Sequence, residues 1–302
     1  MSVDGEAGQA INNARGAATR RPPGNPARNK RGILSWVTLI LLLFALALVL
    51  LPFALVAING VKTSADYALN GPLALPRSFD LSAMVTFWNE VDFTRKLINS
   101  FAISASVAVI AVFMSVLAAY AIGIGKIRGG QGLLVVFLIA IMIPQESLIY
   151  PLFYLSRSVD LFDTMASVVI VLSVLQCAFG TYLLSSVLST VPGELIEAAR
   201  IDGANSWQVL WQVMVPMISP TLTVLATFFF IWTWNEFLIP LVMLISNNNQ
   251  TVSVSLGVLW GQNTTDLTGT AAASLLCILP TIVFFLIFQR TLTRGLVVGA
   301  IK

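Results

Sequence analysis

The stretch EAARIDGANSWQVLWQVMVPM (Glu197–Met217) is polar and carries ionic side chains, although it lies between two intensely apolar runs. Its first residue, Glu197, and the arginine and aspartate that follow are of the types that form charge-assisted hydrogen bonds. Gly203 has no side chain, so another backbone could approach it closely. These residues therefore suit ionic, close-range contact with another chain. An amphipathic hairpin on the membrane surface, anchored by Trp207 and Trp211, explains the same residues equally well.

Two further acidic residues, Glu146 and Glu236, lie inside apolar runs of membrane-spanning length. A carboxylate within a membrane is costly, which makes each of them a candidate for lining a transport pathway or a gate. Gln145, Gln176 and Asn235 are weaker candidates of the same kind. For each of these residues the alternative is a structural hydrogen bond that fixes helix packing, and the sequence leaves that alternative open.

The composition excludes most catalytic and metal chemistry. The chain has no histidine and only two cysteines, Cys177 and Cys277, so neither a Cys/His zinc cluster nor a disulfide framework can be built. Both cysteines are interpreted as small buried apolar side chains. The segment GIGKIRGG, residues 123–130, imitates a phosphate-binding loop poorly, because Ile127 follows the lysine instead of Ser or Thr. We therefore predict no catalytic residue, no metal site and no cofactor bound by this chain.

The elements that must position these residues are membrane helices. Of the 302 residues 57% are apolar and only 10% are charged, which is typical of an all-α polytopic membrane protein. A spanning helix needs about 20 apolar residues. Small residues in the second expected span, at positions 100, 104, 108, 111 and 115, give it a slim face for helix packing. Six segments reach spanning length: Ile33–Ile58, Leu97–Ile122, Leu133–Leu155, Ala166–Ser189, Ile218–Ile245 and Ala271–Gln289.

Basic residues indicate the orientation in the lipid bilayer. With the N-terminus inside, 12 of the 17 lysines and arginines fall on the cytoplasmic side, which favours cytoplasmic N- and C-termini. The net charge of +3 then reflects topology, and no nucleic acid partner is expected. Residues 1–32 are interpreted as a disordered cytoplasmic tail. Residues 33–302 form the membrane domain, with a cytoplasmic loop at 190–217 and a cytoplasmic C-terminal tail at 290–302.

Within the loop, the sequence predicts two short helices. The first begins after Pro192 and ends at Asp202, where the following glycine can adopt the left-handed conformation that terminates a helix. Ser206 is expected to cap the second helix, in which apolar residues recur at helical spacing. Pro216 is expected to end that helix before the fifth span.

The loop resembles the EAA signature of the permease subunits of binding-protein-dependent ABC importers, at Glu197, Ala198, Ala199, Gly203, Val213, Val215 and Pro216. Three other stretches are similar to the carbohydrate-uptake branch of that family, which includes the second permease subunit of the maltose transporter. They are IPQESLIYPLFYLSRSVDLFDT (143–164), WNEFLIPL (234–241) and GLVVGAIK (295–302). The usual final glycine of that branch is absent here.

The resemblance implies a non-enzymatic permease of a prokaryotic plasma membrane importer for a di- or oligosaccharide. Its implied partners are a second permease subunit, two nucleotide-binding ATPase subunits that hold ATP and magnesium, and an extracytoplasmic substrate-binding protein. The loop would be the coupling helix, with Glu197 as a charge partner for the ATPase and Ala198 and Ala199 keeping that face slim. Asp202, Gly203 and Pro216 would shape the loop, and Trp207 and Trp211 would fill an interface pocket or brace the loop.

The sequence leaves one alternative substrate class open and matches two other functions less well. Within the family, a glycerol 3-phosphate or related polyol phosphate importer is the alternative substrate class. An ion-coupled secondary carrier would more naturally show two related halves, and no convincing internal repeat is found. A channel would need a filter segment or a ring of charges at its pore, and neither is visible.

Overall fold

The computed structural model describes residues 33–125, 127–262 and 266–300. The N-terminal tail predicted for residues 1–32 lies outside this range, as do the last two residues of the predicted C-terminal tail. The chain divides into two units, residues 1–53 and residues 54–302, and each is described by itself. The described part of the first unit belongs to one apolar helix, whose side chains from Ser35 to Phe53 are exposed, as suits a helix surrounded by lipid.

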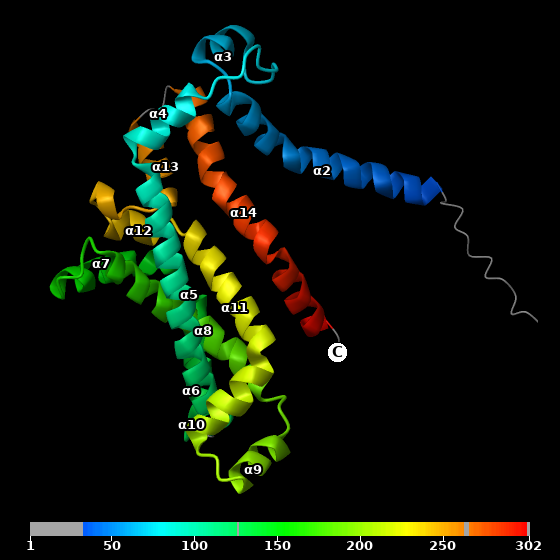
Figure 1. Cartoon of the computed structure of the whole chain (residues 1–302), viewed down its shortest axis with the longest axis vertical. Coiled ribbons are helices and arrows are strands. Elements are labelled where there is room, and N and C mark those ends of the chain that lie inside the picture. The colour runs from blue at the N-terminus through cyan, green and yellow to red at the C-terminus, as the bar shows by residue number, and fades with distance from the viewer. Residues whose placement is uncertain (1–32, 126, 263–265, 301–302) are drawn as a thin grey trace, which may run out of the picture. The chain divides into compact units, whose positions relative to one another are not determined.

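The described residues form helices and no strands, which confirms the predicted all-α membrane fold (Figure 1). Within the described residues, five helices are long and apolar enough to cross a membrane, and a bent pair, counted as one span, brings the number to six. The elements are α2 (Ile33–Gly60), α3 (Ser64–Asn70), α4 (Ser82–Glu90), α5 (Phe93–Gly123), α6 (Gly130–Met142), η1 (Gln145–Leu148), α7 (Ile149–Ser158), α8 (Met165–Leu188), α9 (Gly193–Ile201), α10 (Ser206–Gln208), the π-helical η2 (Val209–Met214), α11 (Val215–Asn235), α12 (Leu238–Met243), η3 (Asn247–Asn249), α13 (Val252–Gln262) and α14 (Leu267–Ala300).

Two of the expected spans are not continuous helices. The third bends by 93° between α6 and the segment Gln145–Ser158. Pro144 lacks an N–H group and forces the preceding Ile143 into an extended conformation, with ψ of 123°, so the helix cannot continue there. The prediction of one fifth span to Ile245 is also wrong, because Glu236 is extended and separates α11 from α12.

The C-terminal tail predicted at 290–302 is likewise not a separate element in the described residues. Helix α14 continues to Ala300, well past the expected end of the sixth span at Gln289.

The centre of the second unit is the packing of α5 against α8 and α11, which also appear side by side in Figure 1. The small residues expected to form a packing face on α5 are all buried there. Ser115 of α5 donates hydrogen bonds to the carbonyls of Ala111 and Cys177, at 2.6 and 3.3 Å. A Cβ atom placed on Gly180 of α8 would lie 2.2 Å from Ser115 Oγ and 3.1 Å from a ring carbon of Phe229 of α11. Only glycine therefore permits this approach of the three helices.

We expect Gly180→Ala to destabilise the protein, because the added methyl group must displace Ser115 and Phe229. Overpacking of this kind costs about 1–3 kcal/mol, which more than offsets the gain of about 1 kcal/mol from replacing a helical glycine by alanine. The midpoint of thermal unfolding in detergent measures the difference. Gly132→Ala in α6 is the matched control, since a Cβ there meets no described atom within 4 Å. Equal midpoints for the two variants would contradict the close approach.

Candidate functional site

The loop between α8 and α11 begins with α9, which ends in a Schellman motif. The N–H of Gly203 donates to the carbonyl of Arg200 at 3.1 Å, and the N–H of Ala204 donates to the carbonyl of Ala199 at 3.0 Å. Gly203 has a φ of +86°, the left-handed conformation in which a side chain is unfavourable. The predicted helix end at Asp202 is therefore confirmed, since Asp202 is the C-cap residue of α9.

The second half of the loop differs from the sequence prediction in two respects. Asn205, and not Ser206, caps the helix: its side chain accepts the N–H of Gln208 at 2.9 Å, and the Gln208 side chain accepts the N–H of Asn205 at 2.8 Å. This reciprocal capping box satisfies two N–H groups at once, which one serine hydroxyl cannot do. Pro216 does not end the helix: it follows the π-helical turn η2 directly, and the helical run continues through it to Asn235.

Helix α5 holds the start of this helical run in place. The Tyr120 hydroxyl donates to the carbonyl of Ser206 at 3.0 Å, and the ring of Phe113 stacks on Trp211 with 6.0 Å between centroids. Trp211 therefore packs the loop against a membrane helix. This contact agrees with the second of its two predicted roles, bracing the loop, and not with filling an interface pocket. Trp207 contacts Trp211 edge-on at 5.6 Å but is 59% exposed, so it remains accessible to another chain.

The opposite surface of α9 is exposed. Glu197, Ala198 and Asp202 are exposed, whereas Ala199 is half-buried and packs onto the core beneath the helix. Ile201 is 86% exposed, an unusual position for a large apolar side chain at the end of a helix. The sequence analysis missed Ile201, although its position three residues after Ala198 places both on one helical face. We call Glu197, Ala198, Ile201 and Asp202 the α9 face.

The polar residues predicted within the spans serve mostly as structural links. The Gln176 amide donates to the hydroxyl of Thr233 at 2.9 Å and joins α8 to α11. The Asn235 amide donates to the carbonyl of Ile231 at 2.8 Å. Glu236 accepts the N–H groups of Leu238 and Ile239 at 3.1 and 3.2 Å and so caps α12. Such a cap explains why a carboxylate is tolerated at the break between α11 and α12.

Gln145 and Glu146 form the beginning of η1, immediately after the bend at Pro144. Glu146 is exposed and Gln145 is half-buried. The structure thus places these two candidates next to each other at the bend, whereas Gln176 lies in α8 and the α9 face lies in the loop that follows α8.

A cluster of polar contacts at the other end of α5 was not anticipated from the sequence. Lys96, which is 1% exposed, donates to the backbone carbonyl of Asn247 and, at 2.6 Å, to its side-chain oxygen. The Asn99 amide donates to the carbonyls of Asn248 and Gln250 at 2.8 and 3.0 Å. The two oxygens of Asn247 accept hydrogen bonds from the buried ammonium group, and this contact fixes the loop between α12 and α13 to α5.

Asp163, between α7 and α8, holds the same loop from a second side. One carboxylate oxygen accepts the N–H groups of Ile245 and Ser246 at 2.9 and 3.0 Å, and the other accepts the Ser246 hydroxyl. Partial burial by itself would raise the pKa of Asp163, but the hydrogen bonds from Ser246, Asn249 and Ile245 outweigh it and hold that pKa below its usual value. The charged form of Asp163 is therefore the one that fastens the loop.

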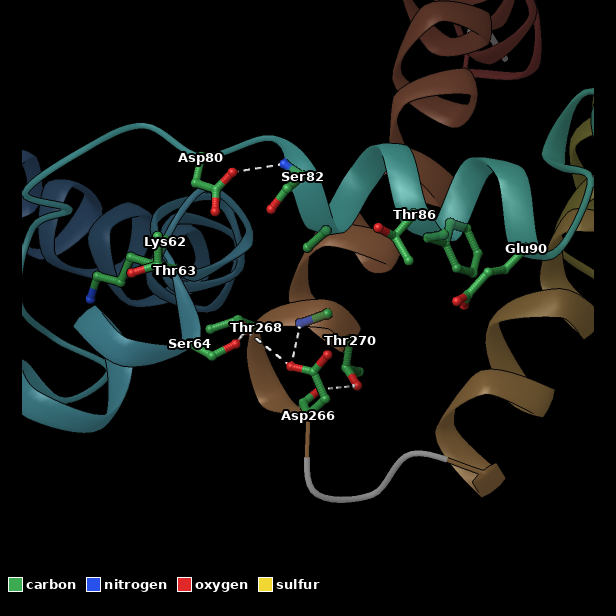
Figure 2. A pocket seen from close by; sticks show the side chains of 13 residues that line it. Lys62, Thr63, Ser64, Asp80, Ser82, Thr86, Glu90, Asp266, Thr268 and Thr270 are labelled. Carbon is green, nitrogen blue, oxygen red and sulfur yellow. Dashed lines mark hydrogen bonds between the residues drawn. The ribbon is translucent and has the colours of Figure 1, made fainter.

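A polar cavity of about 190 Å³ lies at this same end of the second unit, between the starts of α4 and α14 (Figure 2). Two of its three carboxylates serve local contacts. Asp80 accepts the N–H of Ser82 at 2.8 Å, and Asp266 accepts the N–H of Gly269 at 2.9 Å. Among the described residues, no group of three or more acidic or cysteine side chains is arranged to hold a metal ion. The cavity is thus formed by helix caps.

Residues 111–298 match the family described as "Binding-protein-dependent transport system inner membrane component". The trehalose transport system permease protein of Mycobacterium tuberculosis is 35% identical over 212 residues, which are 70% of this chain and 77% of that protein. The sn-glycerol-3-phosphate transport system permease protein of Shigella flexneri is 30% identical over 276 residues, covering 87% and 96% of the two chains. A chain from a bacterial ABC transporter that imports the acidic polysaccharide alginate shares the fold, with a TM-score of 0.73, 22% identity and coverage of 85% and 96%.

We expect Gly203→Ala to loosen the end of α9. A residue with a Cβ pays about 1–2 kcal/mol in the left-handed conformation, whereas asparagine tolerates it better. Hydrogen–deuterium exchange of the last turn of α9 should therefore rise clearly in Gly203→Ala and only slightly in Gly203→Asn. Gly193→Ala is the control, because a Cβ there, as at Gly203, meets no described atom within 4 Å but Gly193 does not have a positive φ. Equal exchange in all three variants would exclude the strain argument.

Acid should weaken the fastening at Asp163. Because the pKa of this carboxyl is lowered in the folded state, its stabilising contribution is present above the pKa of an unfolded aspartate, about 3.9, and is lost as the pH falls through the folded value. Thermal unfolding midpoints measured between about pH 6 and pH 3 should fall less steeply in Asp163→Asn than in the wild type. Asp160→Asn, at another left-handed aspartate nearby, should keep the wild-type slope. An unchanged slope in Asp163→Asn would refute this role.

Proposed function

This chain belongs to the binding-protein-dependent transport system inner membrane component family, and from that membership we propose that it is a permease subunit of an ATP-driven importer for a di- or oligosaccharide. In this proposal the chain forms half of the translocation pathway and passes the motion of an ATPase to its helices through the loop 190–217. The exposed α9 face is the single observation that carries the proposal.

The α9 face has the chemistry of a docking surface. It combines a carboxylate, Glu197, with a slim alanine and the exposed apolar side chain of Ile201. A carboxylate and an apolar residue side by side suit a partner cleft that offers an arginine next to an apolar pocket. The interpretation of the loop as a surface hairpin anchored by both tryptophans is weakened, since Trp211 stacks on Phe113 of α5.

We propose the partners that the resemblance to importer permeases implies. A second permease subunit completes the pathway, two nucleotide-binding subunits on the cytoplasmic side bind ATP and magnesium, and an extracytoplasmic binding protein delivers the substrate. This chain holds neither nucleotide nor metal and performs no hydrolysis itself. Both of its termini lie on the cytoplasmic side of a prokaryotic plasma membrane, as the distribution of basic residues favours.

The contacts within the chain support a mechanism of coupling. Force applied to α9 reaches η2 and then α11, because Ser206 through Met214 continue without a break into that helix. The same force reaches α5 through Tyr120 and Trp211. The close packing of α5, α8 and α11 around Gly180 leaves no room for the helices to slide past one another, so the three helices move together. Closure of the ATPase pair thus becomes a rigid-body rotation of the bundle between inward-open and outward-open states.

A polyol phosphate importer is the second candidate, because the Shigella flexneri relative is named for sn-glycerol 3-phosphate. The trehalose permease has the higher identity of the two, 35% against 30%, but it matches a shorter stretch. Identity alone therefore does not separate the two substrate classes, and the charge of the pathway residues has to decide between them.

The coupling role is tested by co-purification of the ATPase and by ATPase activity in liposomes. Glu197→Ala should reduce both readouts roughly tenfold or more, since losing one member of a buried charge pair costs about 2 kcal/mol or more. Gly203→Asp should also reduce both readouts, because it adds a carboxylate where the partner's backbone is proposed to approach closely. Insertion into the membrane should be unchanged, because a side chain on Gly203 meets no described atom of this chain within 4 Å. Ile201→Asp should have the same effect as the other two substitutions.

Glu90→Ala is the matched control, since it removes an exposed carboxylate at the other end of the second unit. It should leave ATPase co-purification and activity unchanged. Normal ATPase co-purification with all three loop variants would remove the docking role from the α9 face.

A further inference from the structure

The exposed face of η1 and α7 repeats polar and aromatic side chains at helical spacing. Glu146, Tyr150 and Tyr154 follow one another at intervals of four residues. The two tyrosines lie on one face of α7, and η1, which contains Glu146, precedes α7 directly. Tyr150 is 71% exposed and Tyr154 is 54% exposed, and Glu146 is exposed as well. We call these three residues the α7 strip.

The two tyrosines support each other's orientation. Their ring centroids lie 4.7 Å apart with the planes tilted by 57°, and the Tyr150 hydroxyl donates to the Tyr154 hydroxyl at 3.3 Å. Phe153 meets the edge of Tyr154 at 5.5 Å from beneath the strip. Two rings fixed in this way present an aromatic surface whose phenol oxygens still have hydrogen-bonding capacity.

Lipid alone is a poor occupant for this strip. Tyrosines that face lipid are common near a membrane interface, but a Glu146 that faced the hydrocarbon would place a carboxylate in an apolar environment at high cost. A sugar ring fits all three side chains, since its C–H face packs on an aromatic ring while its hydroxyls donate to phenol and carboxylate oxygens. Ligand sites usually combine aromatic walls with a few polar groups that fix orientation.

The charge of the strip selects among sugars. Arg157 is the only basic residue in the sequence between Arg128 and Arg200, and its guanidinium lies over the rings of Phe153 and Phe162, 5.7 and 5.6 Å from their centroids. Arg157 keeps its positive charge on these rings, but it lies outside the strip, 11 positions after Glu146. Glu146 is therefore the only charged side chain among the three residues of the strip. An anionic substrate would be repelled by Glu146, whereas a neutral one would find a hydrogen-bond acceptor.

We infer that the α7 strip is a stacking site for a neutral sugar unit at the bend of the third span, and that Glu146 disfavours anionic substrates such as glycerol 3-phosphate. This inference rests on the proposed function. It also adds residues that determine specificity, and it favours a neutral sugar over a polyol phosphate as the substrate class.

The test uses the complete importer, co-purified with its partner subunits and its binding protein and reconstituted in liposomes with ATP. Radiolabelled trehalose, melibiose, raffinose and glycerol 3-phosphate are the probes, and the readout is substrate imported per ATP hydrolysed. Tyr150→Ala and Tyr154→Ala should each lower this ratio for the neutral sugar roughly 3- to 10-fold, because an aromatic contact contributes about 0.5–1.5 kcal/mol. Tyr150→Trp, which keeps an aromatic face, should retain most of the transport.

Leu155→Ala is the matched control, since Leu155 is 58% exposed on the same helix but lies off the strip, and it should leave the ratio unchanged. ATPase activity stimulated by the loaded binding protein should stay near wild type in every variant, which separates loss of stacking from loss of folding or docking. Glu146→Gln should reduce the difference in import per ATP hydrolysed between the neutral sugars and glycerol 3-phosphate. Glu146→Lys should reduce this difference further.

Two results would overturn the inference while leaving the importer intact. In one, the wild type imports glycerol 3-phosphate in preference to every neutral probe. In the other, both tyrosine-to-alanine variants import the neutral sugar at the wild-type ratio, as they would if the strip faced lipid or the second permease subunit. ATP-driven import of none of the four probes by the wild type would instead reject the proposed function itself.

Discussion

The close approach of α5 and α8 at Ser115 and Gly180 is the constraint on which the rest of the structure depends. With Phe229 of α11 against the same glycine, it locks three membrane helices into one body. Because α5 is continuous from Phe93 to Gly123, this body reaches from the polar contacts of Lys96 and Asn99 at one end to those of Tyr120 at the other. A rigid body that touches both loops can transmit a displacement from one to the other.

The helix breaks lie in the third and fifth spans, where the unit formed by α5, α8 and α11 would need to move relative to the segments that follow the breaks. The third span bends by 93° at Pro144, and the fifth is interrupted at Glu236, where the carboxylate replaces the lost helical contacts by capping α12. Broken helices of this kind are tolerated in a membrane only where other groups satisfy the freed backbone or where the segment lines a cavity. The α7 strip begins directly at the first of these breaks. The proposed sugar contacts therefore begin at the 93° bend of the third span.

The sequence predicted the helices better than their interruptions. Hydropathy located all six apolar segments, because a run of about 20 apolar residues has few alternatives. It could not separate the end of α11 from α12, since Asn235 and Glu236 are only two polar residues in a long apolar stretch. The helix end at Gly203 followed from the special conformation of glycine. The cap at Asn205 was assigned to Ser206 because both residue types favour that position, and only the reciprocal bond with Gln208 decides between them.

Contacts between distant parts of the chain were beyond the reach of sequence patterns. Nothing in the residues around Lys96 indicates that its partner lies 151 positions later, and Asp163 is likewise held to a loop more than 80 positions away. The sequence did not indicate Ile201 for a different reason. An isoleucine in an amphipathic helix is expected to be buried, and only the structure shows that this one is exposed. The roles of Glu197 and Ala198 remain predictions that come from the motif, to which the structure adds an exposed setting.

The energy source for uptake tests the account most directly. Liposomes containing the complete importer, with sugar-loaded binding protein outside and ATP inside, are compared with liposomes given a proton or sodium gradient and no nucleotide. The account predicts that labelled sugar accumulates only with ATP and the binding protein, and that accumulation persists when ionophores abolish every ion gradient. Accumulation that follows an ion gradient without ATP would contradict the account and identify an ion-coupled carrier.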